Sequence, residues 1–258
     1  MRVLLATLFI LISCGKDNSP KETTTLPPQT DPRQTPFISA EIDPAETVKI
    51  PDLLPTMYYI ATEDQVPCKG KYGNANYNGT ERSTIKTMEG DVIAEVCTRF
   101  AKTLAMEGSA VLKDRGHGTI SVNFSGIVNG EKRFHQLERC IYGEGVDRDL
   151  CLLPYHTIAA DNKAHPVGEI VFIPKAVGLK LPDGSLHEGY FIVRDTGKAF
   201  EGIGMQRVDL FTGLDPDFNN VFSRAGFNHH SPTPAFRIQG QSAEIIKNKL
   251  HDKFGDLY

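Results

Sequence analysis

Two aspartates lie close together in the sequence, each attached to a run of apolar residues that favour β-structure. Asp195 follows the run at 190–193 and precedes Gly197, so it lies at the end of an expected strand. Asp209 interrupts the apolar run at 208–211, which would set its carboxyl against a sheet face and raise its pKa. A carboxylic acid still protonated near neutral pH can donate a proton to a leaving oxygen. We therefore predict acid catalysis from this stretch.

The same residues also have a purely structural interpretation. Asp-Thr-Gly at 195–197 is common turn chemistry, because an aspartate side chain can bond its own backbone two residues further on. Asp209 could form a structural ion pair with Arg207 or Arg194. Carboxyls with a shifted pKa mark functional sites only statistically, so local sequence leaves both interpretations open.

The elements that must hold these aspartates are mostly short strands. We expect strands at 57–62, 110–112, 119–124, 157–160, 169–173, 190–193 and 234–239. Apolar residues recur every three or four positions between Ile85 and Leu104, which predicts an amphipathic helix there. Ser242 is expected to cap a last helix. Many closely spaced strands with few helices indicate a mainly β protein built on a β-barrel.

The first fourteen residues have the pattern of an export signal. One arginine precedes an apolar run of about ten residues, too short to span a bilayer. Leu11-Ile12-Ser13-Cys14 resembles the cleavage and lipidation site of bacterial lipoproteins. That resemblance implies a lipid on Cys14 and, because Gly15 rather than aspartate follows it, a place on the periplasmic face of the outer membrane.

The rest of the chain divides into expected regions. Residues 15–55 carry eight prolines among threonines and charged residues, which predicts an extended tether. A barrel domain is expected over 56–240, with an insertion at about 68–151, and a C-terminal helix over 241–258. The net charge of −4, without a basic cluster, argues against nucleic acid as a partner. We expect a monomer.

Four cysteines besides Cys14 suit an exported protein. An even number in an oxidising compartment predicts two disulfides, although three pairings are possible. We favour Cys140 with Cys151, which closes a glycine-rich loop, and this leaves Cys68 with Cys97. A zinc site is the alternative, but the spacings contain no CxxC pair. We expect no metal and no cofactor.

Three aspartates then recur in a recognisable order: Ala159-Ala160-Asp161, His165-Pro166-Val167-Gly168, Arg194-Asp195-Thr196-Gly197, and Arg207-Val208-Asp209-Leu210-Phe211-Thr212-Gly213. Together with Arg224-Ala225-Gly226 and Asn228-His229-His230, this order resembles the three-aspartate (3D) domain of membrane-bound lytic transglycosylases. The resemblance covers about residues 155–238. It implies a six-stranded double-psi β-barrel. The family usually has Gly and Ile where this chain has Lys198 and Phe200.

The resemblance also implies an activity. Lytic transglycosylases cleave the β-1,4 bond between N-acetylmuramic acid and N-acetylglucosamine in peptidoglycan and leave a 1,6-anhydro sugar. By position in the pattern, Asp209 matches the catalytic acid, and Asp195 and Asp161 match its aspartate neighbours. The partner would be the glycan strand, with contacts expected from Thr196, Gly197, Lys198, Arg207 and His229.

Other functions remain possible on the sequence alone. The same barrel could serve as a glycan-binding or wall-loosening module without catalysis, as in expansin-like proteins, because fold does not fix function. A structural lipoprotein that has lost activity is a further alternative. His229 and His230 could join Asp195 in a metal site, but we prefer to place them in a loop that lines the glycan groove.

Overall fold

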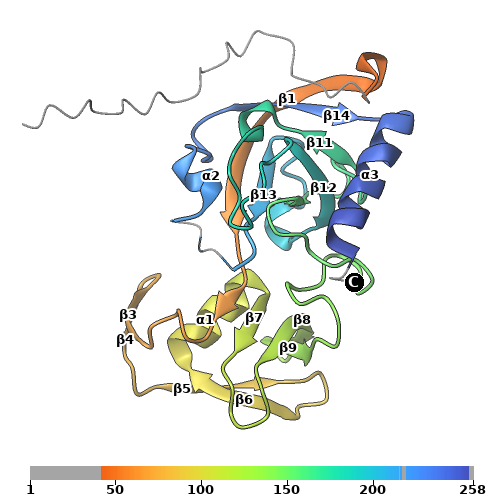
Figure 1. The fold of residues 1–258 in the computed structure, drawn as a ribbon. Helices are drawn as coiled ribbons and strands as arrows, with labels where there is room; N and C mark the ends of the chain where they lie inside the picture. Colours follow the sequence, from red (N-terminus) through yellow and green to blue (C-terminus); the bar gives the residue numbers. More distant parts are fainter. Residues whose placement is uncertain (1–41, 215, 217–218, 256–258) are drawn as a thin grey trace, which may run out of the picture. The chain divides into compact units, whose positions relative to one another are not determined.

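Six strands close into a barrel in the computed structural model, which describes residues 42–214, 216 and 219–255. Their order is β1, β13, β10, β12, β11 and β14, and β14 pairs again with β1 (Figure 1). The strands are β1 (Thr47–Tyr58), β10 (Thr157–Ala160), β11 (Ile170–Phe172), β12 (Tyr190–Asp195), β13 (Arg207–Phe211) and β14 (Thr233–Ile238). The mainly β fold and the six-stranded barrel predicted from the sequence are confirmed.

Strands β10 and β11 are buried along their whole length, and a hydrophobic cluster lies on each side of β11. One cluster contains Leu53, Ile158, Phe191 and Leu210, and the short helix α2 (Val221–Arg224) adds Phe222 to it. Fully apolar runs such as β11 are typical of strands covered on both faces.

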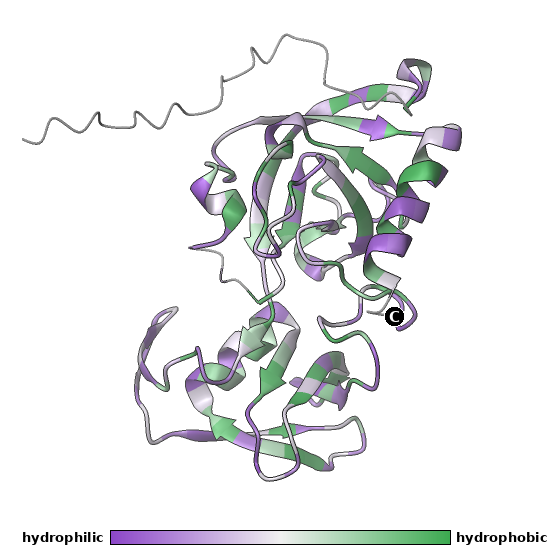
Figure 2. Ribbon diagram, in the orientation of Figure 1, coloured by the Kyte–Doolittle hydropathy of each residue, from purple (hydrophilic) through white to green (hydrophobic). Residues whose placement is uncertain are grey.

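The helix α3 (Gly240–Phe254) covers part of the barrel. Its residues Ile246 and Leu250 belong to the same cluster as Ile170 and Phe172 of β11, and Figure 2 shows polar and apolar residues alternating along it. The cap expected from Ser242 is wrong, since Gln239 is the N-cap residue. Residues 256–258 of the expected helix lie outside the described residues.

The start of α3 is held by a residue far away in the sequence. The carboxylate of Glu46, in the short helix η1 (Pro44–Glu46), accepts from the amides of Gln241 at 2.9 Å and Ser242 at 2.7 Å. An acidic side chain at a helix N-terminus satisfies amides that have no partner within the helix. No local sequence signal points to this contact.

The second half of the predicted tether is folded, so that prediction is wrong from Pro44 onward. Residues 44–46 form η1, and β1 runs from 47 to 58. Strand β1 pairs antiparallel with β14 up to Leu53 and parallel with β13 from Leu54. Pro51 lies where the register with β14 shifts, and Pro55 follows the end of that pairing. Prolines are tolerated at such positions because no ladder hydrogen bond is lost.

Between β1 and β10 the chain builds three smaller sheets. Strands β2 (Ala61–Thr62), β7 (Ser109–Leu112), β8 (Ile120–Val128) and β9 (Glu131–Gln136) form one; β3 (Lys69–Tyr72) pairs with β4 (Ala75–Asn78), and β5 (Arg82–Lys86) with β6 (Val92–Cys97). The helix α1 (Thr98–Glu107) packs on this segment, which has a core of its own around Phe100, Leu104 and Val122. The expected strand at 57–62 is divided, because β1 ends at Tyr58 and β2 belongs to another sheet.

The helix expected over 85–104 is wrong in its first half. Residues 82–97 form the hairpin β5–β6, and only 98–107 are helical. Gly90, in the turn, has a φ of 99°, which favours glycine and ends any helix there. In β6, Ala94 and Val96 are buried and Glu95 between them is exposed, which is the alternation of a strand.

Both disulfides have the pairing favoured from the sequence. Cys68 bonds to Cys97 and Cys140 to Cys151. The second closes a short loop that reaches β12, as described below. None of the helices in the described part of the chain has the length and apolar character needed to cross a membrane.

Candidate active site

Asp195 and Asp209 lie on two strands that flank the same central strand. Ala159 of β10 is in register with Asp209 of β13 on one side and with Asp195 of β12 on the other. Two strand spacings separate the aspartate Cα atoms by roughly 10 Å. On the far side of β13, Thr56 of β1 is in register with Asp209. The barrel thus brings together two carboxyls that are fourteen residues apart in the sequence.

Asp209 has an incompletely satisfied carboxyl group. Its Oδ1 atom is buried and makes no hydrogen bond to any described residue. The nearest charge is the Arg207 guanidinium, with 3.8 Å between Nη2 and Oδ1. Burial raises the pKa of Asp209 to about 6, and Arg207 opposes this increase. The pKa of Asp209 is raised, as predicted, and Arg207 is one of the two arginines that the structural interpretation named as a partner.

Asp195 is a half-buried carboxyl at the end of β12. Burial raises its pKa to about 6, while a hydrogen bond from the Thr196 amide, 2.8 Å from Oδ1, lowers it. The charge of Asp209 adds a smaller increase to the pKa of Asp195. Burial is the largest cause of the raised pKa of both Asp195 and Asp209, whose strands β12 and β13 are separated by the single strand β10.

Tyr58, at the end of β1, belongs to the same site. Burial raises the pKa of its phenol well above the usual range, and the charges of Asp195 and Asp209 raise it further. Its hydroxyl lies beside Asp195 but forms no hydrogen bond of standard geometry within the described residues. The hydroxyl of Thr56 is likewise buried without such a partner there. Sequence reasoning placed both residues in or before the first strand and missed them as site residues.

Asp161 has a different environment, in the turn that follows β10. Its Oδ1 accepts from the Lys163 amide at 3.0 Å and its Oδ2 from the Gly202 amide at 2.9 Å. These hydrogen bonds lower the pKa of Asp161. An ionised carboxylate therefore ties the turn after β10 to the connection between β12 and β13. A part for Asp161 in catalysis stays a prediction.

The residues expected to contact glycan occupy several places. Thr196 donates its hydroxyl to the Ala160 carbonyl at 2.8 Å, beside Asp195. Gly197 precedes the short helix η3 (Lys198–Phe200), in which Lys198 is exposed. His229 is exposed, and its ring lies tilted beside that of His230, with 3.7 Å between the ring centroids. Their contacts with a glycan stay predictions.

The contacts bear on two alternatives from the sequence: which arginine lies beside Asp209, and whether a metal site is present. Arg194 donates to the Cys151 carbonyl at 2.8 Å, so of the two candidate arginines it is Arg207 that lies beside Asp209. Among the described residues no three His, Cys, Asp or Glu side chains are grouped so that they could hold a metal ion.

The loop closed by Cys140 and Cys151 lies against the end of β12. The Val146 amide donates to the Arg194 carbonyl at 2.9 Å, next to Asp195. A Cβ atom on Gly145 would stand 2.1 Å from that carbonyl oxygen, so only glycine fits. The register between β10 and β12 shifts at this point. The disulfide loop therefore supports the bulge that places Asp195.

Comparison with known proteins gives the site a family context. Matching solved structures include MltA of Escherichia coli with bound chitohexaose, 12% identical, covering 73% of this chain and 71% of that one at a TM-score of 0.47. A membrane-bound lytic murein transglycosylase from Agrobacterium tumefaciens is 14% identical, and the match covers 81% of this chain and 77% of that one at a TM-score of 0.44. MltA from Neisseria gonorrhoeae is 13% identical, and the match covers 71% of each chain at a TM-score of 0.43. No curated protein sequence matches. The family model of the 3D domain matches residues 156–230, the segment that carries all three aspartates.

Proposed function

We propose that this protein is a lytic transglycosylase that cleaves the β-1,4 bond between N-acetylmuramic acid and N-acetylglucosamine in peptidoglycan. The observation that carries the proposal is Asp209: a buried carboxyl oxygen without a hydrogen bond in the described part of the chain, and a pKa of about 6. It lies within the segment that the 3D-domain model matches, and its place in the three-aspartate pattern is the one that the resemblance assigns to the acid. A carboxyl kept protonated by its surroundings is suited to general acid catalysis.

One carboxyl is enough for this reaction. Protonated Asp209 donates its proton to the glycosidic oxygen as the bond to the muramyl anomeric carbon breaks. The muramyl 6-hydroxyl then attacks that carbon, and the Asp209 carboxylate accepts the hydroxyl proton, so the acid is regenerated and a 1,6-anhydro sugar results. Because the nucleophile is tethered to the substrate, no second carboxyl has to activate water. Ordinary glycosidases need two such groups.

Residues near Asp209 line the site, position the strand that carries Asp209, and contact the glycan. Asp195 and Tyr58 form the polar wall beside Asp209, and Asp161 fixes the connection that leads to β13. Glycan contacts are assigned to the following residues: Thr196, Gly197, Lys198, Arg207 and His229. If water were the nucleophile, Asp195 would be the candidate second carboxyl.

The proposal places the enzyme at the cell wall. We assign its lipid anchor to Cys14, which lies outside the described residues, and its location to the periplasmic face of the outer membrane. The two disulfides suit an oxidising compartment. Its partner there is the peptidoglycan glycan strand, and we expect it to act as a monomer.

Replacing Asp209 by Asn separates an enzyme from a glycan-binding module. The variant should stop clearing a suspension of purified sacculi while it still sediments with them, because the amide keeps the shape of the side chain but cannot donate the acid proton. Asp149→Asn, at a side chain that is 83% exposed, is the matched control and should clear sacculi like the wild type. A wild type that sediments with sacculi but never clears them would favour the non-catalytic, expansin-like alternative.

A further inference from the structure

His165 is a buried histidine with hydrogen-bond acceptors at both ring nitrogens. Its side chain has no exposed surface. Its Nδ1 lies 2.7 Å from the Glu169 Oε1 atom, and its Nε2 lies 2.8 Å from the Met205 carbonyl oxygen. A carboxylate and a carbonyl only accept, so both ring nitrogens must carry a proton. The geometry requires a buried imidazolium cation.

The charges around His165 fit this state. Glu169, whose side chain is 6% exposed, also forms an ion pair with Arg237, with 2.8 Å between Oε2 and Nε. Burial lowers the pKa of His165, but the hydrogen bonds to Glu169 and Met205 and the charge of Glu169 outweigh it, whereas Arg237 opposes them. The net change is an increase in the pKa of His165.

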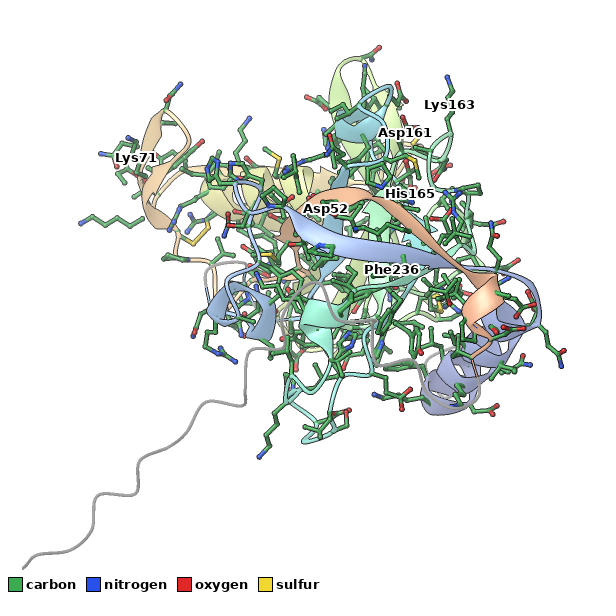
Figure 3. The ribbon with its side chains drawn as sticks, turned by 90° about the horizontal axis from the view of Figure 1, so that it is seen from above. Asp52, Lys71, Asp161, Lys163, His165 and Phe236 are labelled. Carbon is green, nitrogen blue, oxygen red and sulfur yellow. A yellow bond between two sulfur atoms is a disulfide. The ribbon has the colours of Figure 1, made fainter. Side chains whose placement is uncertain are left out.

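The position of His165 connects two parts of the chain that meet at the site. It lies in the turn after β10, with Asp161 and Lys163 (Figure 3). Its partner Met205 stands two residues before β13 and four before Asp209. Gln206 lies between Met205 and the start of β13, and its backbone carbonyl accepts a hydrogen bond from the Leu54 amide at 2.6 Å.

Two anchors from one turn therefore hold the connection between the site aspartates. The Asp161 carboxylate accepts a hydrogen bond from the Gly202 amide, and the His165 ring donates one to the Met205 carbonyl oxygen. Both contacts lie on the segment that leads from Asp195 into β13, so they fix where that strand begins. The position of Asp209 along β13 follows from that start.

We propose that His165, as a buried imidazolium, is a positioning residue that fixes the Asp195–Asp209 connection in the geometry in which Asp209 works. The part that concerns catalysis rests on the proposed function. Loss of the charge leaves either the Glu169 carboxylate or the Met205 carbonyl facing a ring nitrogen without a proton. The connection then loses one of its two anchors.

Nitrogen NMR tests the protonation state directly. In purified protein labelled with ¹⁵N at the histidine rings, both nitrogens of His165 should be protonated, and the change to the neutral ring should fall above the usual pKa of about 6.5. His187 is the internal reference, since it donates to Tyr155 and accepts from the Gly189 amide, as a neutral ring does. Glu169→Gln should move the His165 transition to lower pH. A His165 ring that is neutral at pH 6, or a transition that Glu169→Gln leaves in place, would overturn the proposal.

Hydrogen exchange tests the anchoring. In His165→Asn, amide exchange at residues 202–207 should become about tenfold faster, because Asn cannot bridge both acceptors. Glu169→Gln gives the same readout if the Asn variant does not fold. Lys163→Gln is the matched control: it removes one exposed positive charge from the same turn and should leave exchange unchanged. Exchange that stays at the wild-type rate in both His165→Asn and Glu169→Gln contradicts the anchoring.

Activity separates this inference from the proposed function. At pH 5.5, His165→Asn should reduce kcat for anhydro-sugar formation about 10- to 100-fold with KM within about twofold, since only the placement of the acid changes. Lys163→Gln should match the wild type. An unchanged kcat in His165→Asn would refute a positioning part. A wild type that forms no anhydro sugar would refute the proposed function alone, while the NMR and exchange results would still decide whether His165 holds the connection.

Discussion

Three aspartates of one barrel differ in charge because their surroundings differ. Asp161 accepts backbone amides, which stabilise the ionised form and lower its pKa. Asp195 and Asp209 are shielded from water, which destabilises the ionised form and raises the pKa of each to about 6. At pH 5, Asp161 therefore serves as a fixed anion in the backbone network, whereas Asp209 retains the proton that an acid catalyst needs.

Arg207 sets the upper pH limit of the proposed acid. Its positive charge, 3.8 Å from Asp209, lowers the pKa of that carboxyl. Arg207→Gln should therefore let Asp209 stay protonated to higher pH, and the alkaline limb of kcat/KM should move up by roughly half a pH unit. Arg139→Gln, at an exposed ion pair, should leave the limb in place. A limb that does not move in Arg207→Gln would show that another group controls it.

Asp209 should also cost stability at neutral pH. Its pKa of about 6 in the folded protein exceeds the ordinary value of 3.8, so the folded state binds this proton more tightly than the unfolded chain does. The resulting stabilisation is complete below pH 3.8 and is lost as pH rises through about 6. At pH 8, Asp209→Asn should thus raise the free energy of unfolding by on the order of 2 kcal/mol.

Urea unfolding at pH 4 and pH 8 measures this difference. The gain in Asp209→Asn should be present at pH 8 and nearly absent at pH 4, where the wild-type carboxyl is protonated in the folded state. Asp149→Asn, at an exposed carboxyl, should show no such pH dependence. A stability loss in Asp209→Asn at pH 8 would mean that the charged form is stabilised in the fold, contrary to the burial seen here.

At the scale of elements, the disulfide loop of residues 140–151 positions the end of β12. Gly145→Ala would place a methyl group against the Arg194 carbonyl oxygen, so the loop or the strand must move. We expect a loss of about 1–3 kcal/mol in the free energy of unfolding and about a tenfold lower kcat, because Asp195 follows Arg194 directly.

Gly255→Ala is the control for that substitution. Gly255 also has a φ outside the left-handed region, and a Cβ atom there meets nothing within 4 Å. It should unfold and react like the wild type, as measured by thermal melting and muropeptide release. Equal effects of the two substitutions would show that the contact between the loop and β12 carries no special weight.

The elements that carry the aspartates could be predicted from the sequence because each is a short apolar run bounded by turn residues. Strands β10, β12 and β13 stand where the pattern placed them, and Cys140 and Cys151 form the disulfide that was favoured because it closes a glycine-rich loop. The hairpin β5–β6 was taken for a helix because Ile85, Met88, Val92 and Val96 follow the helical period in the sequence, although Met88 and Val92 are exposed in the structure. Residues 47–55 of β1 were taken for part of a tether because prolines and polar residues are frequent there; the structure shows that Pro51 and Pro55 lie where β1 changes its partner strand.

The side chains that complete the site could not be found in this way. Tyr58 lies beside Asp195 although the two residues are far apart in the sequence, and His165 contacts Met205, which is 40 residues away in the sequence. A local pattern describes only neighbours along the chain, whereas closure of the barrel decides which distant residues meet. His165 was noticed only as part of the His-Pro-Val-Gly pattern, with no chemistry attached to it.

At the scale of the whole molecule, closure of the barrel depends on β1. This strand bridges β13 and β14, so the ring of strands is open without it. Removal of residues 1–55 deletes most of β1, and we expect a chain that lacks a cooperative thermal transition. Removal of residues 1–41 keeps every described element and should retain the transition. Circular dichroism melting compares the two, and a cooperative transition in the shorter chain would contradict the part given to β1.

The product of the reaction tests the central claim most directly. Purified sacculi are incubated with the wild type and with Asp209→Asn, and the released muropeptides are analysed by mass spectrometry. We predict 1,6-anhydro-muropeptides from the wild type and none from Asp209→Asn. Muropeptides with reducing ends would contradict the account, since water would then be the nucleophile, and so would anhydro products from Asp209→Asn.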